Sequence, residues 1–268
     1  MPLPRPVAHG LRTWAALWRV RALHELHYRA NLLLNVGQVF VDLAIGVVAI
    51  RLVFSNVDAI NGWEEPELLV VLGTYTILDA VIRALVLPGM WMLMQDIQEG
   101  TFDAVLLMPA DEQLIVTARE LSIWDLSGVA IGGCVTAYGA SRVDGLGAFD
   151  VLAYLALLPV AVSIVYGFFL AVTSLAFRLI NLRDLLFRLF QGASYSGRWP
   201  LGIYPGWLRI ALTVIVPIGL AVTIPSSALA GRLSWTGIAA SASAGAAVLV
   251  WSRWVFRRGT RAYSGASA

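Results

Sequence analysis

The stretch LLVVLGTYTILDAVIRALVLPGMWMLMQDIQEGTFDAVLLMP, residues 68–109, changes from a long apolar run into an acidic loop. The apolar part, 68–94, exceeds the roughly 20 residues that a helix needs to cross a bilayer. The loop over 95–113 carries five acids and no base, although apolar residues dominate on both sides. The run predicts a membrane protein. The function of an acidic loop between two spans then needs an explanation.

The composition extends this interpretation to the whole chain. Of the 268 residues, 59% are hydrophobic and 13% charged, and the mean hydropathy is +0.75. Soluble domains seldom have such a composition. We therefore expect an all-α, polytopic membrane protein whose single membrane domain covers 32–268. Apolar run length and helix breakers predict six spans, at about 33–55, 68–94, 114–138, 151–176, 207–225 and 236–256.

The basic residues orient these spans. Five Arg precede the first span, five lie between the fourth and fifth, and four follow the sixth, whereas the loops on the other side hold only two. This excess marks the cytoplasmic side, so both termini and the acidic loop are expected there. Residues 1–31, with tryptophans and arginines at helical spacing, predict an amphipathic helix in the inner interface rather than a cleavable signal.

Several functions are excluded or disfavoured by what the sequence lacks. All 19 basic residues are Arg, and a Walker A loop needs a Lys, so the chain cannot be its own P-loop ATPase. We expect no catalytic residues and no metal site, since the three His lie in the N-terminal segment without a completing ligand set and Cys134 is the only cysteine. Nucleic-acid binding is disfavoured because orientation already explains the Arg clusters.

The acidic loop has two interpretations. It is either a solvated turn or a surface that docks on a cytoplasmic partner. Ile97, Phe102, Val105, Leu106 and Met108 interleave with the acids. Two short amphipathic helices, broken at glycine and proline, would present an apolar stripe beside a charged one, which favours docking.

Charges inside the spans are candidates for a translocation path. Asp79 and Arg83 are four apart on one helical face and are expected to pair. Asp42 needs a polar partner on another helix or a water-filled cavity, and Asp125 poses the same question. In the C-terminal third, TIPSSALAG, 223–231, looks too broken by Pro225 for a regular helix and too apolar for an outer loop, which predicts a re-entrant segment.

Three stretches together, DIQEGTFDAVLLMP (96–109), RWPLGIYPGWLR (198–209) and VIVPIGLAVTIPSSALAG (214–231), resemble the ABC type-2 exporter permeases, in particular their short six-span bacterial branch. The resemblance runs over nearly the whole chain. The motif I-x-x-G-x-x-D-x-x-L-x-x-P falls on five residues here: Ile97, Gly100, Asp103, Leu106 and Pro109.

The resemblance implies a permease with an N-terminal interface helix and a cytoplasmic coupling helix that docks on a separate ATP-binding subunit. The cofactors, ATP and Mg, would belong to that subunit, and a second permease chain, identical or related, would complete the path. It further implies export across the bacterial inner membrane. Scarce charges and plentiful aromatics in the spans favour an amphipathic or lipid-like cargo. A proton-coupled secondary transporter and a non-transporting membrane scaffold remain alternatives.

Overall fold

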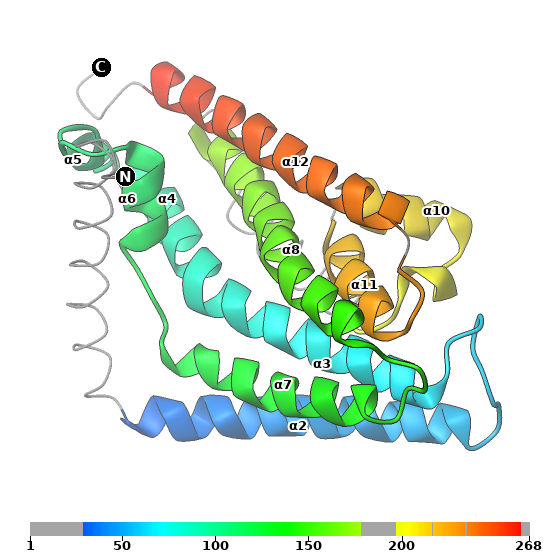
Figure 1. Ribbon diagram of the computed structural model, residues 1–268. Coiled ribbons are helices and arrows are strands. Elements are labelled where there is room, and N and C mark those ends of the chain that lie inside the picture. Colours follow the sequence, from blue (N-terminus) through cyan, green and yellow to red (C-terminus); the bar gives the residue numbers. More distant parts are fainter. Residues whose placement is uncertain (1–28, 178–196, 216, 234, 264–268) are drawn as a thin grey trace.

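The computed structural model describes residues 29–177, 197–215, 217–233 and 235–263, and the regular elements of this part of the chain are helices joined by turns and loops (Figure 1). The predicted interface helix over 1–31 lies almost wholly outside the described residues. The elements, in chain order, are α2 (Arg29–Phe54), α3 (Glu65–Val81), η1 (Ile82–Val86), α4 (Leu87–Glu99), α5 (Asp103–Leu106), α6 (Glu112–Ala118), η2 (Trp124–Leu126), α7 (Ser127–Ala140), α8 (Ala148–Ser174), η3 (Leu175–Phe177), η4 (Leu201–Ile203), α10 (Gly206–Ile210), η5 (Ala211–Ile215), α11 (Ile218–Leu229) and α12 (Trp235–Ala262).

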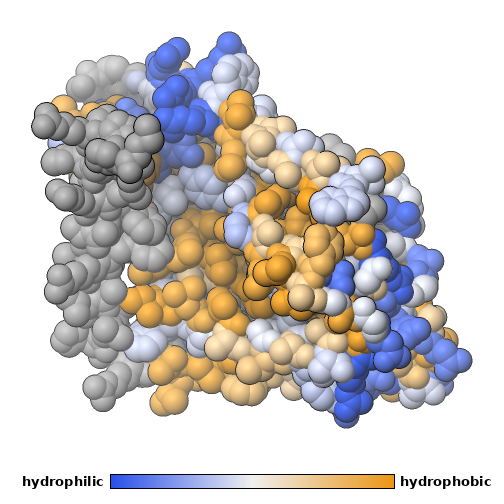
Figure 2. Space-filling view, in the orientation of Figure 1, coloured by the Kyte–Doolittle hydropathy of each residue, from blue (hydrophilic) through white to orange (hydrophobic). Residues whose placement is uncertain are grey.

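In the described part of the chain, four helices are long and apolar enough to cross a membrane: 32–54, 65–99, 148–177 and 235–262. They correspond to the predicted spans one, two, four and six. Figure 2 shows hydrophobic side chains over the middle of one face, with hydrophilic residues gathered towards its upper end and its lower right edge. This distribution fits a bilayer around the middle of the molecule. The remaining two predicted spans, 114–138 and 207–225, are interrupted in the structure.

The central helix is the continuous run α3–η1–α4, which at 1.5 Å per residue is about 52 Å long. Its interior holds Pro88, which cannot donate a backbone hydrogen bond to the carbonyl of Ala84. The backbone N–H of Ser122 donates to that carbonyl instead, at 3.0 Å. The helix widens into the π-turn η1 just before this point. A buried carbonyl needs a hydrogen-bond donor. The unwound segment around Ser122 supplies the donor that Pro88 cannot give to the Ala84 carbonyl.

That unwound segment is where the predicted span over 114–138 breaks. The chain is helical in α6, irregular over 119–123, and helical again from η2 into α7. A continuous helix here was the expectation, and it is wrong because the sequence pattern does not reveal that Ser122 donates a hydrogen bond to the Ala84 carbonyl of η1. A break inside a membrane domain is tolerated where protein surrounds it and satisfies its backbone groups.

α3 and α7 pack closely through glycines. A Cβ at Gly132 would lie 2.8 Å from the carbonyl oxygen of Gly73 and 2.9 Å from the backbone nitrogen of Ile77. A Cβ at Gly139 would lie 2.8 Å from the Pro66 carbonyl oxygen. Small residues let membrane helices approach to backbone contact, where van der Waals packing holds them together. These glycines therefore define the α3–α7 interface.

α12 packs along α8 through a similar stripe of mostly small residues (Figure 1). The buried residues of α12 recur at helical spacing: Ser241, Gly245, Ser252, Phe256 and Gly259. Apart from Phe256 these residues are small, which allows the two long helices to pack closely against each other.

The segment from Gly202 to Arg232 is a helical hairpin that begins and ends at the same end of the molecule. Asn61 donates a hydrogen bond to the carbonyl of Gly202, and Arg232 donates to the carbonyl of Gly62. Both partners lie just before α3. The hairpin turns at Pro217, which precedes α11.

The predicted fifth span over 207–225 is therefore wrong. Neither arm of the hairpin is long enough to cross a hydrocarbon core of about 30 Å. Phe177, in contrast, lies beyond the far end of α4, with its ring 5.2 Å from that of Phe102. Phe177 and Gly202 thus lie at opposite ends of the central helix.

The expected helix break at Pro225 is also wrong. α11 runs through Pro225 to Leu229 and packs on α8 and α3, burying Ala221, Val222 and Ala228. Ser226 and Ser227 donate their hydroxyls to the carbonyls of the residues four before them, at 2.8 and 2.7 Å. Burial of the apolar face offsets the lost proline hydrogen bond, and the break falls at Pro217 instead.

Candidate functional site

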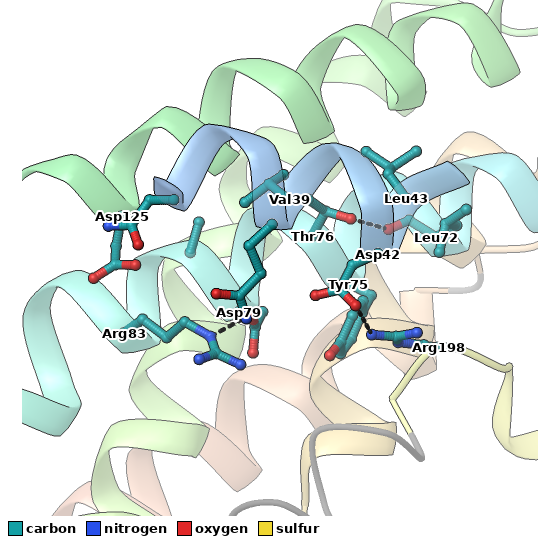
Figure 3. Close-up of a pocket in the computed structure, with 13 residues that line it drawn as sticks. Val39, Asp42, Leu43, Leu72, Tyr75, Thr76, Asp79, Arg83, Asp125 and Arg198 are labelled. Carbon is teal, nitrogen blue, oxygen red and sulfur yellow. Dashed lines mark hydrogen bonds and ion pairs between the residues drawn. The ribbon is translucent and has the colours of Figure 1, made fainter. Parts of the chain in front are cut away.

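A polar hollow, partly open to solvent, lies between α2, α3 and the segment around η2 (Figure 3). It brings together all four intramembrane candidates from the sequence, which come from three separate segments. Residues of opposite character share the walls: apolar Val39, Leu43, Leu72 and Ala80, and polar Asn35, Gln38, Asp42, Tyr75, Thr76, Asp79, Arg83, Asp125 and Arg198.

Asp42 finds the partner that the sequence required. Its carboxylate lies 3.4 Å from the guanidinium of Arg198, whose carbon sits 5.5 Å from the ring centre of Tyr75. In Figure 3 Arg198 reaches the hollow from the segment that leads to the hairpin, and it faces both Asp42 and Tyr75. Sequence reasoning missed Arg198 because it counted this residue among the cytoplasmic basic cluster. The unpaired intramembrane Asp42 was the only signal that such a cation existed.

Asp79 and Arg83 pair as predicted. The Arg83 Nε donates to the Asp79 carboxylate at 2.8 Å, and the two residues stand one turn apart. Arg83 lies in the π-turn η1, whose wider backbone directs the side chain along the wall of the hollow. The pair neutralises itself inside the membrane domain.

Asp125 lies at the other end of the hollow, on η2. Ser122, in the same unwound segment, donates its hydroxyl to the Asp125 carboxylate. The unwound segment that donates to the Ala84 carbonyl therefore also places the Asp125 carboxylate beside the central helix. With three carboxylates and two guanidinium groups in its walls, the hollow carries one net negative charge when all are ionised.

The second candidate site is the loop between α4 and α6. Gly100 ends α4 in the left-handed conformation, with φ 71°, and its N–H bonds back to the carbonyl of Asp96. Glycine adopts this conformation without a side-chain penalty, so the predicted turn is confirmed. α5 follows for a single turn, and exposed Pro109 separates it from α6.

The two faces of this loop differ from the predicted stripe. Phe102 and Val105 are fully buried, and Ile97 is half-buried against the same core. Leu107, with 86% of its surface exposed, points outward with Leu106, Met108 and the carboxylate of Asp103. The expectation of one continuous stripe is corrected here, because the left-handed turn at Gly100 rotates α5 relative to α4. Only the outward part is accessible to a partner.

Two of the five loop acids are paired with arginines of the same chain. Asp96 forms an ion pair with Arg119, and Asp111 accepts hydrogen bonds from Arg253 at 2.5 and 3.1 Å. Those hydrogen bonds lower the pKa of the Asp111 carboxyl. Glu99 and Asp103 are exposed. The outward face of the loop is therefore both apolar and acidic.

Within the described ranges no group of His, Cys, Asp and Glu is arranged to hold a metal ion. The three His of the sequence lie outside the described residues. Cys134 is exposed on α7.

The fold and these sites define a class: a polytopic, all-helical membrane protein with a charged hollow among its helices and a structured loop at one end. A family model described as ABC-2 family transporter protein matches residues 40–267. The chain belongs to this family, whose members are the membrane-embedded permease components of ABC transporters. No curated protein and no solved structure matches the chain.

Proposed function

We propose that this chain is the permease subunit of an ATP-binding cassette exporter in the bacterial inner membrane. A separate subunit binds Mg and ATP and hydrolyses the nucleotide. The observation that carries this proposal is the loop between α4 and α6, which exposes leucines and acids at the end of a membrane domain while its other face is buried. A merely solvated turn has no use for Leu107 exposed at 86%.

The chemistry of this face specifies its partner. Leu106, Leu107 and Met108 fit an apolar cleft, and the exposed acids Glu99 and Asp103 of the same loop fit basic residues at its rim. Asp96 and Asp111 are occupied by Arg119 and Arg253 and contribute little to docking. We therefore expect the ATPase surface to be apolar at its centre and rimmed by Arg or Lys.

The orientation follows from charge and from the hairpin. The docking loop is cytoplasmic, the hairpin over 202–232 is on the outer side, and both termini are cytoplasmic. Among the described residues, the proposed passes are α2, α3–α4, α6–α7, α8 and α12. Arg198 and Arg209 were counted among the cytoplasmic arginines, but in this arrangement they lie on the outer side. Without them the cytoplasmic side still carries more Arg than the outer side.

The hollow is the proposed substrate path. Its walls mix apolar side chains with charges of both signs, which suits an amphipathic or lipid-like substrate. Charged walls partly open at membrane depth require a cover, and a second permease chain, identical or related, supplies one. The carboxylates of Asp42, Asp79 and Asp125 also favour one alternative, a proton-coupled transporter without an ATPase.

The test is copurification of the tagged chain with its ATPase in mild detergent. We expect Leu107→Asp to reduce ATPase recovery by about tenfold or more, since it places a charge in an apolar contact. Ala262→Asp adds the same charge at an exposed position of α12 and serves as the matched control. Equal recovery of ATPase with both variants contradicts the docking surface. A chain that carries out transport driven by a proton gradient, with no ATPase bound, establishes the alternative.

A further inference from the structure

The buried side of the docking loop is attached to α8 and α12 by a cluster of aromatic rings. Phe102 is fully buried, and its ring centre lies 5.2 Å from Phe177 and 5.5 Å from Tyr263, both edge-on. Phe177 also contacts Phe256, at 6.1 Å. We call Phe102, Phe177, Phe256 and Tyr263 the aromatic latch. Phe102 is the only member that comes from the loop.

The rings of the aromatic latch are closely packed against α12. Phe177 lies directly on the backbone of α12, because a Cβ added at Gly259 would meet its ring at 2.5 Å. Edge-to-face aromatic pairs hold a preferred geometry in addition to burying apolar area. A displacement of Phe102 therefore cannot be absorbed locally and acts on Phe177 and Tyr263.

A second attachment joins the other end of the loop to the same two helices. Arg253 of α12 donates to the Asp111 carboxylate and, at 2.7 Å, to the side-chain oxygen of Gln113. Gln113 in turn donates to the Tyr166 hydroxyl on α8 at 2.9 Å, and Thr117 lies 2.8 Å from that hydroxyl. This chain of hydrogen bonds shares no side chain with the aromatic latch.

From these two attachments we infer that Phe102 and Arg253 are positioning residues that make the docking loop, α8 and α12 move as one body when ATP binds to the partner. The backbone alone would pass a movement of the loop to α4 and α6, its covalent neighbours. The latch and the Arg253 contacts add α8 and α12, which are otherwise far from the loop in sequence. The inference rests on the proposed docking of an ATPase at Leu106–Met108.

The experiment measures hydrogen exchange, by mass spectrometry, of the permease–ATPase complex in lipid nanodiscs with and without ATP plus vanadate. In the unaltered complex we expect ATP to change exchange in the peptides that cover the cytoplasmic ends of α8 and α12. Phe102→Ala and Arg253→Gln each reduce the α12 response by about three- to tenfold, and the double variant abolishes it. ATPase recovery stays unchanged, since neither residue is on the outward face.

Two comparisons keep the result interpretable. Trp254→Ala removes an exposed aromatic side chain of the same helix, and its α12 response must equal that of the unaltered complex. Arg253→Gln removes a surface contact and keeps the chain folded even where Phe102→Ala does not. An undiminished α12 response in the double variant overturns the inference, as does the absence of any α12 response in the unaltered complex.

Failure of the docking proposal is recognised separately. If Phe102→Ala or Arg253→Gln releases the ATPase as Leu107→Asp does, these residues only shape the docking face, and the inference is overturned while docking stands. If Leu107→Asp retains the ATPase, the docking surface itself is wrong, whatever α12 does.

Discussion

Asp42 and Arg198 meet in the hollow with their charged groups 3.4 Å apart, although the chain between them crosses the membrane domain several times. The pair joins α2 to the segment that leads into the hairpin over 202–232. α2 otherwise contacts the protein along one side only, with Phe40, Ile45 and Leu52 exposed. The ion pair is therefore one of the contacts that hold this helix against α3.

Neutralising one member of the pair should destabilise the chain. Asp42→Asn leaves Arg198 without its carboxylate, and we expect a loss of about 1–2 kcal/mol, a moderate value because the Asp42 side chain is 46% exposed. The double variant Asp42→Asn, Arg198→Gln should recover part of this loss. Thermal unfolding in detergent measures both, and strictly additive losses would contradict the pairing.

The glycine interface between α3 and α7 allows a matched comparison. Gly132→Ala places a methyl group 2.8 Å from a backbone carbonyl, so the helices must separate. We expect a loss of about 1–3 kcal/mol, which lowers the midpoint of thermal unfolding by about 3–10 °C. Gly133→Ala, one residue on, meets nothing within 4 Å and should leave the midpoint unchanged. Equal effects of the two substitutions would refute close packing at Gly132.

The hairpin predicts the side from which position 207 is reached. In a Cys134→Ser background, Trp207→Cys and Val57→Cys should react with a membrane-impermeant maleimide from outside intact cells. Both positions are exposed, and both belong to the end of the molecule that holds Asn61 and Gly202. Leu107→Cys should react only after the cells are opened. Labelling of position 207 together with position 107 would restore the rejected fifth span.

The Asp111–Arg253 contact predicts a dependence of stability on pH. Because the hydrogen bonds from Arg253 lower the pKa of Asp111 in the folded chain, their contribution is present above the unfolded pKa of about 3.9 and is lost as the pH falls below it. Both side chains are partly exposed, so we expect less than about 1 kcal/mol, or about 1–3 °C.

The measurement compares the unaltered chain with Asp111→Asn. The difference in the midpoint of unfolding should be constant between about pH 5 and 8 and should shrink below about pH 4. A difference that persists at the acid end would mean that Asp111 stabilises the fold by something other than its charge.

Local chemistry made part of this protein predictable. The turn at Gly100 followed from a glycine between two amphipathic segments, and the Asp79–Arg83 pair followed from a spacing of four on one helix. Both depend on residues that are neighbours along the chain. The division of the loop into an inward and an outward face was only partly predictable, since a single helical turn has too few residues to show a period.

Apolar run length is a reliable signal for a helix but says nothing of where its ends lie. The hairpin over 202–232 and a true span contain equally long apolar runs, and only the contacts of Asn61 with Gly202 and of Arg232 with Gly62 distinguish them. The same holds for α6–α7, whose break depends on a carbonyl of α3–α4 left without a donor by Pro88.

The sequence by itself determined that this chain is an all-helical membrane protein with an acidic, structured loop. Helices that lie in lipid must be built from apolar runs, and the turns between them interrupt those runs with polar residues and helix breakers. The tertiary structure alone decided which charges from distant segments meet, where the hairpin turns back, and which side of the loop faces outward. Pairings between distant segments depend on backbone carbonyls, glycine contacts and side-chain reach, and these exist only once the helices are packed.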